Sequence, residues 1–318
     1  MSSGSKIVKV AFVGAGAMCR EHARSFGDIP GVELVGISSR TLAKAEEVAR
    51  EMGIKKVYPD IESLYEGTRA DLVVIAVPEL SIRTVAQEAF QQDWTILMEK
   101  PPGHTLDEAV YLQQLSRELG RSVYVALNRR YLSSTEAVRE DLESREEVRF
   151  IRVEDQQSLE VARQLGHPEA VVQHWMYANS IHLVDYLCHL GRGPVRSVKP
   201  LTRWDPESPG VVLAQVEFDG GDVGIYEGVW NGPGPWAVTV CTPSRRWEIR
   251  PLEQARYINV GERKVHEIEV STEDKTFKPG FRRQAEEVLR AVRGEKHRAT
   301  SLEQAMESMK LVRAIFGV

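Results

Sequence analysis

The sequence predicts an α/β protein whose N-terminal part is a doubly wound parallel sheet and whose C-terminal part is an α+β domain with a mostly antiparallel sheet. Two observations lead to this fold class. Short apolar runs alternate with helix-like segments over the first 127 residues. Beyond them, strand-like segments follow one another directly, and two amphipathic helices close the chain. Strand–helix alternation is typical of a parallel sheet, whereas consecutive strands favour antiparallel pairing.

The N-terminal part contains strands and helices in regular alternation. The candidate strands are apolar and several are rich in β-branched residues, as strands covered on both faces are. They span 6–14, 32–38, 71–77, 94–99 and 122–128. The helix-like segments between them span 17–27, 42–52, 80–91 and 105–119. The last of these opens with Thr105 and has Glu108 three residues later, which is the pattern of a capping box.

The C-terminal part mixes helices with consecutive strands. Helices are expected over 132–145, over the long amphipathic stretch 169–191, and over 281–293 and 301–315. The candidate strands span 195–204, 210–218, 221–230, 236–242 and 246–250. Asp219-Gly220-Gly221 has the composition of a hairpin turn. We expect two domains, residues 1–127 and 128–318.

Composition and charge exclude several classes of function. The chain has 318 residues, of which 42% are apolar and 27% charged, as in a globular protein with a sizeable core. Its net charge of −5 gives no global attraction to nucleic acid or to an anionic membrane. The three cysteines are widely spaced and form no zinc-binding pair, and the opening MSSGSK has no apolar signal core. We expect a cytoplasmic protein with no metal site, no membrane span and no nucleic-acid partner.

The stretch VAFVGAGAMC over residues 10–19 has the pattern of a dinucleotide-binding turn, since a strand precedes it and a helix follows. Gly14 permits a tight turn, and Gly16 lets the backbone approach a pyrophosphate at the helix N-terminus. Helix–strand packing needs a third small residue, and Cys19 is small enough. A strand–helix turn that binds nothing is the alternative. We expect a Rossmann-type cofactor site formed by Gly14, Ala15, Gly16, Ala17 and Met18.

The end of the second predicted strand bears on the choice of cofactor. An NAD site usually has an acidic residue there, about 20 residues beyond the glycines, which binds ribose hydroxyls. This chain has Ser38, Ser39 and Arg40 and no carboxylate. Ser39 can donate a hydrogen bond to a 2′-phosphate, and Arg40 can pair with it or stack over the adenosine. We therefore expect NADP rather than NAD; a solvated surface role is the alternative for Arg40.

Five further segments together resemble the glucose–fructose oxidoreductase and inositol dehydrogenase family (Gfo/Idh/MocA). They are AVPEL (76–80), LMEKPPG (97–103), ALNRRY (126–131), NSIHLVDYLCHLGRGPV (179–195) and SLEQAMESMKLVRAIF (301–316). The resemblance implies a Rossmann domain followed by a domain with a large open sheet, and a homodimer or homotetramer. It also implies a nicotinamide cofactor and a sugar, cyclitol or related polyol as substrate. It adds these residues to the cofactor site: Ala76, Val77, Pro78, Glu99, Lys100, Pro101 and Asn128.

Lys100 and His182 are the candidate catalytic residues. Oxidising a secondary alcohol needs a hydride acceptor and a group that takes the hydroxyl proton; reducing a ketone needs the reverse. A partly desolvated lysine near a cationic nicotinamide has a lowered pKa, so Lys100 could polarise the substrate oxygen or relay its proton. A cis Lys100–Pro101 bond would fix the direction of this lysine. His182 shares a helix face with Asp185, and the resemblance favours a proton role for it over a structural one.

Substrate contacts are expected around the start of the second domain and along the long helix. Amides and aromatic rings suit the hydroxyls and CH faces of a sugar, and arginines suit an anionic substituent. The candidates are Arg130, Trp175, Tyr177, Asn179, His182 and Asp185. The family commonly has an aspartate four residues before the histidine, where this chain has Ala178. Tyr177 or Asn179 could bind substrate beside it, and Tyr177 could act as an acid.

These features predict an NADP(H)-dependent oxidoreductase that transfers a hydride between the cofactor and a secondary alcohol or ketone of a sugar, cyclitol or sugar derivative. Ala178 favours an alternative from another class, a cofactor-binding regulator or scaffold without turnover. A third interpretation keeps the enzyme but gives it another substrate, such as an aromatic diol or a bile-pigment-like compound.

Overall fold

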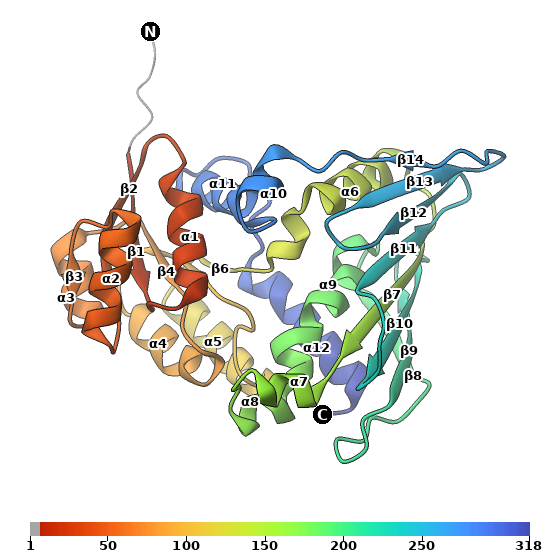
Figure 1. Ribbon diagram of the computed structural model, residues 1–318, viewed down its shortest axis with the longest axis horizontal. Coiled ribbons are helices and arrows are strands. Elements are labelled where there is room, and N and C mark those ends of the chain that lie inside the picture. The colour runs from red at the N-terminus through yellow and green to blue at the C-terminus, as the bar shows by residue number, and fades with distance from the viewer. Residues whose placement is uncertain (1–6) are drawn as a thin grey trace, which may run out of the picture. The chain divides into compact units, whose positions relative to one another are not determined.

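The computed structural model describes residues 7–318, and the chain divides into two compact units (Figure 1). The first unit runs to Asn128 and also contains Thr276–Met306. The second contains Arg129–Lys275 and Glu307–Val318. The sequence predicts that all of 128–318 forms one domain. The structure differs in Thr276–Met306, which belongs to the first unit.

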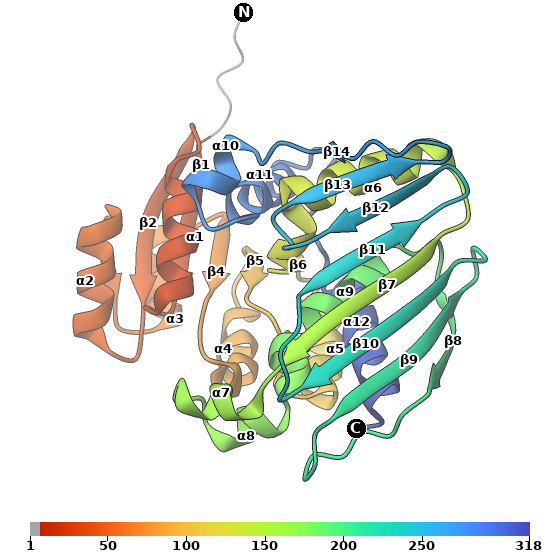
Figure 2. The same cartoon turned by 45° about the vertical axis from the view of Figure 1, so that its right-hand side comes forward.

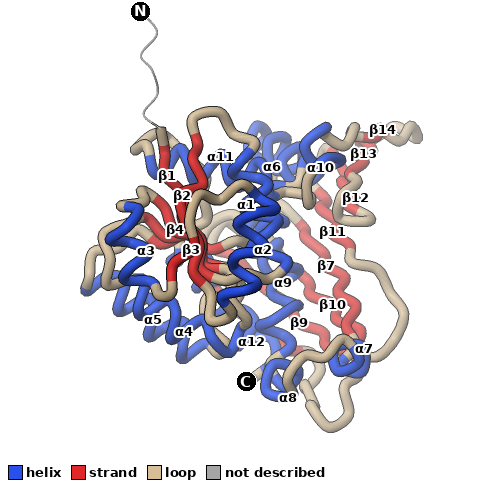
Figure 3. Tube along the Cα trace, turned by 60° about the vertical axis from the view of Figure 1, so that its left-hand side comes forward, coloured by secondary structure: helices blue, strands red, loops and turns tan. Residues whose placement is uncertain are grey.

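The first unit contains a six-stranded parallel sheet in the order β3-β2-β1-β4-β5-β6. Its strands are β1 Val8–Val13, β2 Val32–Ser38, β3 Val57–Tyr58, β4 Leu72–Ile75, β5 Thr95–Met98 and β6 Val123–Val125. Its helices are α1 Ala17–Gly27, α2 Leu42–Met52, α3 Ile61–Thr68, α4 Ile82–Ala89, α5 Leu106–Glu118 and the short η1 Glu79–Ser81. Helices α1 and α2 cover one face, and α3, α4 and α5 cover the other (Figure 3). The strand order reverses between β1 and β4, which is where doubly wound sheets bind ligands.

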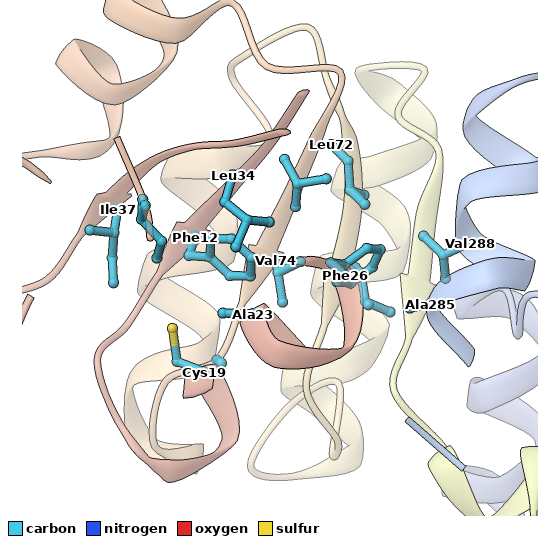
Figure 4. Close-up of a cluster of buried hydrophobic side chains, with 14 of the residues drawn as sticks. Phe12, Cys19, Ala23, Phe26, Leu34, Ile37, Leu72, Val74, Ala285 and Val288 are labelled. Carbon is cyan, nitrogen blue, oxygen red and sulfur yellow. The ribbon is translucent and has the colours of Figure 1, made fainter. Parts of the chain in front are cut away.

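Apolar side chains of β1, β2, β4 and α1 form the core of this unit (Figure 4). Phe12 and Leu34 of the strands pack with Cys19, Ala23 and Phe26 of the helix, and all five are buried. Burying a large apolar side chain stabilises a fold by roughly 1.5–3 kcal/mol. Cys19 therefore has the helix–strand packing role that the sequence predicts for the third small residue of the turn.

Helix α11, Phe281–Val292, completes the same core from the far end of the sequence. Ala285 and Val288 lie in the cluster that contains Phe26 (Figure 4). Beyond this helix, the N–H of Val125 donates to the carbonyl oxygen of Thr300 over 2.9 Å. The apolar face of α11 is buried against α1, which is the physical reason why Thr276–Met306 groups with the first unit.

The second unit contains an eight-stranded sheet in the order β14-β13-β12-β11-β7-β10-β9-β8. Only the β7–β10 pair is parallel. The strands are β7 Phe150–Gln157, β8 Val195–Pro200, β9 Val211–Phe218, β10 Val223–Trp230, β11 Ala237–Cys241, β12 Arg245–Ile249, β13 Ala255–Asn259 and β14 His266–Glu267. The expected turn at 219–221 joins the antiparallel strands β9 and β10, and Gly221 has a φ of 83°.

Helices α6, α9 and α12 lie on one face of this sheet, and no helix among the described residues of the unit covers the other, open face (Figure 2). The helices are α6 Ser133–Arg145, α7 Leu159–Gln164, α8 Glu169–Gln173, α9 Ile181–Leu190, α10 Thr272–Thr276 and α12 Leu302–Phe316, with the short segment η2 Asn128–Tyr131. The single helix predicted over 169–191 is wrong. After α8 the backbone of His174 leaves the helical region (φ −112°, ψ 28°), and a π-helical turn, Met176–Ser180, leads into α9.

Candidate functional site

Gly14 and Gly16 shape the turn that joins β1 to α1. Gly14 has a φ of 113°, and a Cβ atom there would lie 2.1 Å from the carbonyl oxygen of Ala76. The Gly14 N–H donates to the carbonyl oxygen of Ser38 over 2.8 Å, so the turn is tied to the end of β2. A Cβ atom on Gly16 would meet no atom within 4 Å. The first glycine is thus required by the fold, whereas the second leaves open backbone that a ligand can approach.

The N-terminus of α1 lies directly after this turn. Gly16 is its N-cap and provides no side-chain hydrogen bond, and the first helical turn contains no acidic residue. Ala17 is exposed and Met18 is half-buried. The side chain of Arg20 donates to the carbonyl oxygen of Ala15 over 3.3 Å and so supports the loop from the helix side. An uncapped helix N-terminus beside an open glycine fits the pyrophosphate of a dinucleotide.

The end of β2 presents a cation and no carboxylate. Ser38 is buried, and the Ser39 hydroxyl oxygen accepts a hydrogen bond from the Thr41 N–H over 3.4 Å. Arg40 is exposed, and it makes no hydrogen bond or ion pair with the described residues of its unit. Its guanidinium group is therefore available to an anion.

The residues after β4 lie at the same edge of the sheet as the glycine turn. The Ala76 N–H donates to the carbonyl oxygen of Val13 over 2.8 Å, which continues the β1–β4 pairing by one residue. Ala76 is buried, Val77 is half-buried and Pro78 is exposed. The chain thus moves from the core to the surface within three residues at this edge.

Glu99 and His22 form a buried pair beside Lys100. The Nε2 atom of His22 lies 2.8 Å from Oε1 of Glu99, and both side chains are buried. The other carboxylate oxygen accepts the Lys100 N–H over 3.1 Å. Burial raises the pKa of Glu99, but His22 and Lys100 together hold it below its ordinary value. Lys100 itself is half-buried, and its bond to Pro101 is cis.

Asn128 is buried, and its side chain binds the returning C-terminal segment. Its amide nitrogen donates to the carbonyl oxygen of Pro279 over 3.0 Å. Within the first unit this side chain therefore ties the end of the sheet to the segment that leads into α11.

In the second unit, the π-helical turn contains the candidates Tyr177 and Asn179. Tyr177 and Ala178 are buried, whereas Asn179 is half-buried. His182, in the first turn of α9, is 8% exposed, and its ring centroid lies 6.2 Å from that of Trp236. Single π-helical turns within helices are frequent at functional sites, because they shift side chains out of the ordinary helical alignment.

Arg130 and Asp185 bind each other. Two nitrogens of the guanidinium group lie 2.8 and 2.7 Å from the two carboxylate oxygens, and both residues are buried. The Ser308 hydroxyl also donates to Asp185, over 2.6 Å. Burial raises the pKa of Asp185, but Arg130 outweighs it and holds the pKa below its ordinary value. Asp185 thus anchors α9 to the segments before and after it.

Sequence analysis missed a second buried polar group, Asp155 with Gln157 on β7. The Gln157 side chain contacts Asp155, and it also accepts hydrogen bonds from Trp175 and Asn179, two of the predicted substrate contacts. A signal was present in the sequence. In FIRVEDQQ, the strand face that carries the apolar residues Ile151 and Val153 continues with the polar residues Asp155 and Gln157. Polar side chains on a core-facing strand need buried hydrogen-bond partners, so they indicate a buried polar network.

The structure brings the predicted cofactor residues together along one edge of the parallel sheet, at the ends of β1, β2, β4 and β5. The predicted substrate residues lie in the second unit around α9, so Lys100 and His182 belong to different units. Within residues 7–318, no three His, Cys, Asp or Glu side chains are grouped to hold a metal ion. None of the helices in that range combines the length and apolar character needed to cross a membrane.

The parallel sheet and its glycine turn have the architecture of a Rossmann domain. Residues 8–127 match the family model described as oxidoreductase family, NAD-binding Rossmann fold (GFO_IDH_MocA). Over these residues the chain is similar to the Gfo/Idh/MocA oxidoreductase family, and the resemblance stated from the sequence is confirmed.

Two curated relatives match part of this chain. The inositol 2-dehydrogenase of Rubrobacter xylanophilus is 32% identical over 146 residues, which cover 45% of this chain and 42% of that protein. The glucose-6-phosphate 3-dehydrogenase of Bacillus subtilis is 27% identical over 125 residues, which cover 39% and 35%. The matched residues therefore span less than half the length of these two relatives.

Solved structures share the fold of both units. A dehydrogenase from Chromobacterium violaceum superposes with a TM-score of 0.84 at 18% identity, covering 98% of this chain and 94% of that one. The WlbA dehydrogenase from the same organism, in complex with NADH and UDP-GlcNAcA, has a TM-score of 0.75 at 16% identity and covers 98% and 93%. The predicted fold class is thus confirmed for both units of the described residues.

Proposed function

We propose that this protein is an NADP(H)-dependent oxidoreductase that interconverts a secondary alcohol and a ketone on a sugar, cyclitol or sugar derivative. The observation that carries the proposal is the turn at Gly14 and Gly16, where one glycine is required by the fold and the other leaves open backbone at a helix N-terminus. The named activities of the similar inositol and glucose-6-phosphate dehydrogenases support the substrate class.

The first unit supplies the proposed cofactor site. The backbone from Gly14 to Met18 holds the pyrophosphate, and Ser39 and Arg40 bind the adenosine ribose and its phosphate. The segments Ala76–Pro78 and Glu99–Pro101, with Asn128, border the nicotinamide. When bound, this group supplies the hydride acceptor or donor.

Two residues handle protons in this proposal. Oxidation of the alcohol releases a hydroxyl proton together with the hydride, and reduction of the ketone consumes one. Lys100 polarises the substrate oxygen through its ammonium group or relays the proton, and His182 accepts or returns it. Asp185 is already bound by Arg130 and Ser308, so we assign it to holding the helix that carries His182.

The preference for NADP rests on Arg40. Its exposed guanidinium makes no ion pair in its unit, and no carboxylate at the end of β2 would repel a 2′-phosphate. We expect Arg40→Ala to weaken NADPH binding by roughly 10- to 100-fold, which is the loss of one charge-assisted contact, and to leave NADH binding unchanged. Titration followed by nucleotide fluorescence measures the dissociation constants of NADPH and NADH. Arg50→Ala, an exposed arginine of α2, is the matched control. Equal losses for the two nucleotides would reject the NADP assignment.

Turnover is tested on a panel of polyols and sugars with either cofactor. The panel contains myo-inositol, D-glucose 6-phosphate, UDP-N-acetylglucosamine and an aromatic diol, and absorbance of the reduced nicotinamide follows the reaction. We expect turnover of at least one cyclitol or sugar.

The buried Ala178 favours the second candidate, a cofactor-binding regulator or scaffold. Tight cofactor binding without hydride exchange on any compound would favour that candidate.

We further propose that the open face of the eight-stranded sheet joins copies of this chain into a homodimer or homotetramer. The family resemblance supports this assembly. Apolar side chains on that face are exposed or half-exposed, including Phe150, Ile225 and Val229. Sedimentation equilibrium tests the proposal, and a monomer at micromolar concentration would contradict it.

A further inference from the structure

Gln157 lies at the centre of a buried hydrogen-bond network in the second unit. Its side-chain oxygen accepts from the indole N–H of Trp175 over 2.8 Å and from the amide nitrogen of Asn179 over 2.9 Å. Its side-chain nitrogen donates to Oδ1 of Asp155 over 2.6 Å. Gln157 is 2% exposed and Asp155 is also 2% exposed, so water does not compete for these contacts.

The donor and acceptor roles in this network allow one arrangement only. The Trp175 indole can donate but never accept, so the atom of Gln157 that faces it is the carbonyl oxygen. The amide nitrogen of Gln157 must then face Asp155, which is an acceptor when ionised. The group of Asn179 that faces the same carbonyl oxygen must be its amide nitrogen. The orientation of the Asn179 side chain is therefore fixed by Trp175 through Gln157.

Asp155 holds the other end of the network with neutral partners. The Tyr226 hydroxyl donates to Oδ2 over 2.7 Å, and Gln157 donates to Oδ1. No Lys or Arg of this unit is hydrogen-bonded to the carboxylate or forms an ion pair with it. Tyr226 binds one carboxylate oxygen and Gln157 the other, which opposes rotation of the Gln157 amide.

Asn179 is the one polar member of the network that is half-buried rather than buried. Its Oδ1 atom accepts no hydrogen bond from the described residues of this unit. We propose that Gln157 is a positioning residue that fixes Asn179 with this oxygen presented as a hydrogen-bond acceptor for a substrate hydroxyl. The inference rests on the proposed function and adds a specificity rule to it.

The rule concerns which substrate groups are accepted at this position. A hydroxyl can donate to the Asn179 oxygen, whereas an O-methyl ether, a fluoro group or a keto oxygen cannot. A free asparagine could rotate its amide and serve either kind of group. Because the network prevents that rotation, compounds without a donor at this position leave a polar atom unpaired and bind more weakly.

The kinetic test uses Gln157→Leu and the panel compound that is turned over fastest. We expect KM to rise about tenfold with kcat changed less than about threefold, because one hydrogen bond to bound substrate is lost. Gln156→Leu is the matched control, since this neighbouring glutamine points to the other face of β7 and should leave KM unchanged. If Gln157 acts through Asn179, then Gln157→Leu adds little to KM in an Asn179→Leu background. Full additivity of the two effects would overturn the proposal.

A second measurement does not depend on turnover. In ¹⁵N-labelled protein, the side-chain amide signals of Asn179 should shift in Gln157→Leu and in Trp175→Phe, and stay in place in Gln156→Leu. Unchanged Asn179 signals in Gln157→Leu would overturn the positioning role even if a substrate is found. Shifted signals with no turnover of any panel compound would instead reject the proposed function and leave the network intact.

Discussion

Glu99 in the first unit and Asp155 in the second are both buried carboxylates on strands or at their ends, but their partners differ. Glu99 faces the imidazole of His22, which together with a neighbouring lysine holds its pKa below the ordinary value against the effect of burial. Asp155 faces the neutral donors Tyr226 and Gln157, and burial raises its pKa to about 6. The charge of the first is therefore fixed across the neutral range, whereas that of the second changes just below it.

This difference follows from what each carboxylate supports. Glu99 accepts the backbone N–H of Lys100 and lies in the segment that we propose borders the nicotinamide. Asp155 orients an amide, for which an acceptor is enough and a nearby cation is unnecessary. Glu99, which stays ionised, thus has an ionisable partner, whereas Asp155, which orients an amide, has neutral partners. Three predictions test this comparison.

The largest expected effect is at Lys100, the residue that Glu99 supports. Lys100→Ala should lower kcat by roughly 10²- to 10⁴-fold, the usual contribution of a general acid or base, while cofactor affinity stays nearly unchanged. Steady-state kinetics and nucleotide fluorescence measure the two quantities. Lys44→Ala, an exposed lysine of α2, is the control. A normal kcat in Lys100→Ala would contradict the proton role of this residue. It would also contradict the view that Glu99 supports catalysis through Lys100.

His22→Leu should lower the free energy of unfolding by roughly 3–5 kcal/mol, because it leaves the Glu99 carboxylate buried without its partner. Replacing both residues by leucine removes the charge as well as its partner, so the double variant should recover part of this loss. Urea denaturation followed by circular dichroism gives the losses for His22→Leu, Glu99→Leu and the double variant. Simple addition of the two single losses would show that the pair is not coupled.

The smallest expected effect is the pH dependence caused by Asp155. Its pKa rises from 3.8 to about 6 on folding, so the folded state binds more protons between these values and stability falls as pH rises through this window. The loss amounts to about 3 kcal/mol and is complete above the folded pKa. The stability of Asp155→Asn relative to the wild type should therefore increase from about pH 4 to about pH 7.5 by up to this amount. A difference between the two proteins that is constant with pH would contradict the burial argument.

The sequence was sufficient to predict features that depend on residues close together in the chain. Gly14 is needed because the chain turns with a positive φ against β4, and such a turn has a short, fixed pattern. The Thr105 hydroxyl accepts the Glu108 N–H over 3.3 Å, as the capping pattern predicts for α5. Both features depend on residues only a few positions apart.

The remaining features depend on partners that are distant in the sequence. Asp155 and Tyr226 are brought together by the parallel pairing of β7 with β10, which no local pattern specifies. The π-helical turn before His182 was missed because 169–191 is apolar at helical spacing throughout, so periodicity does not show where the helix is interrupted. The proton roles of Lys100 and His182 stay predictions, and Lys100→Ala tests the first of them.

The return of Thr276–Met306 to the first unit affects how the chain folds during synthesis. When the ribosome has made the glycine turn and all six parallel strands, the nascent chain still lacks α11. The apolar surface around Phe26 that α11 covers therefore stays exposed to solvent. The second unit also needs its last residues, Glu307–Val318. Neither unit can be completed before residues 276–318 emerge, so chaperones can bind both units until then, and removal of these residues damages both units at once.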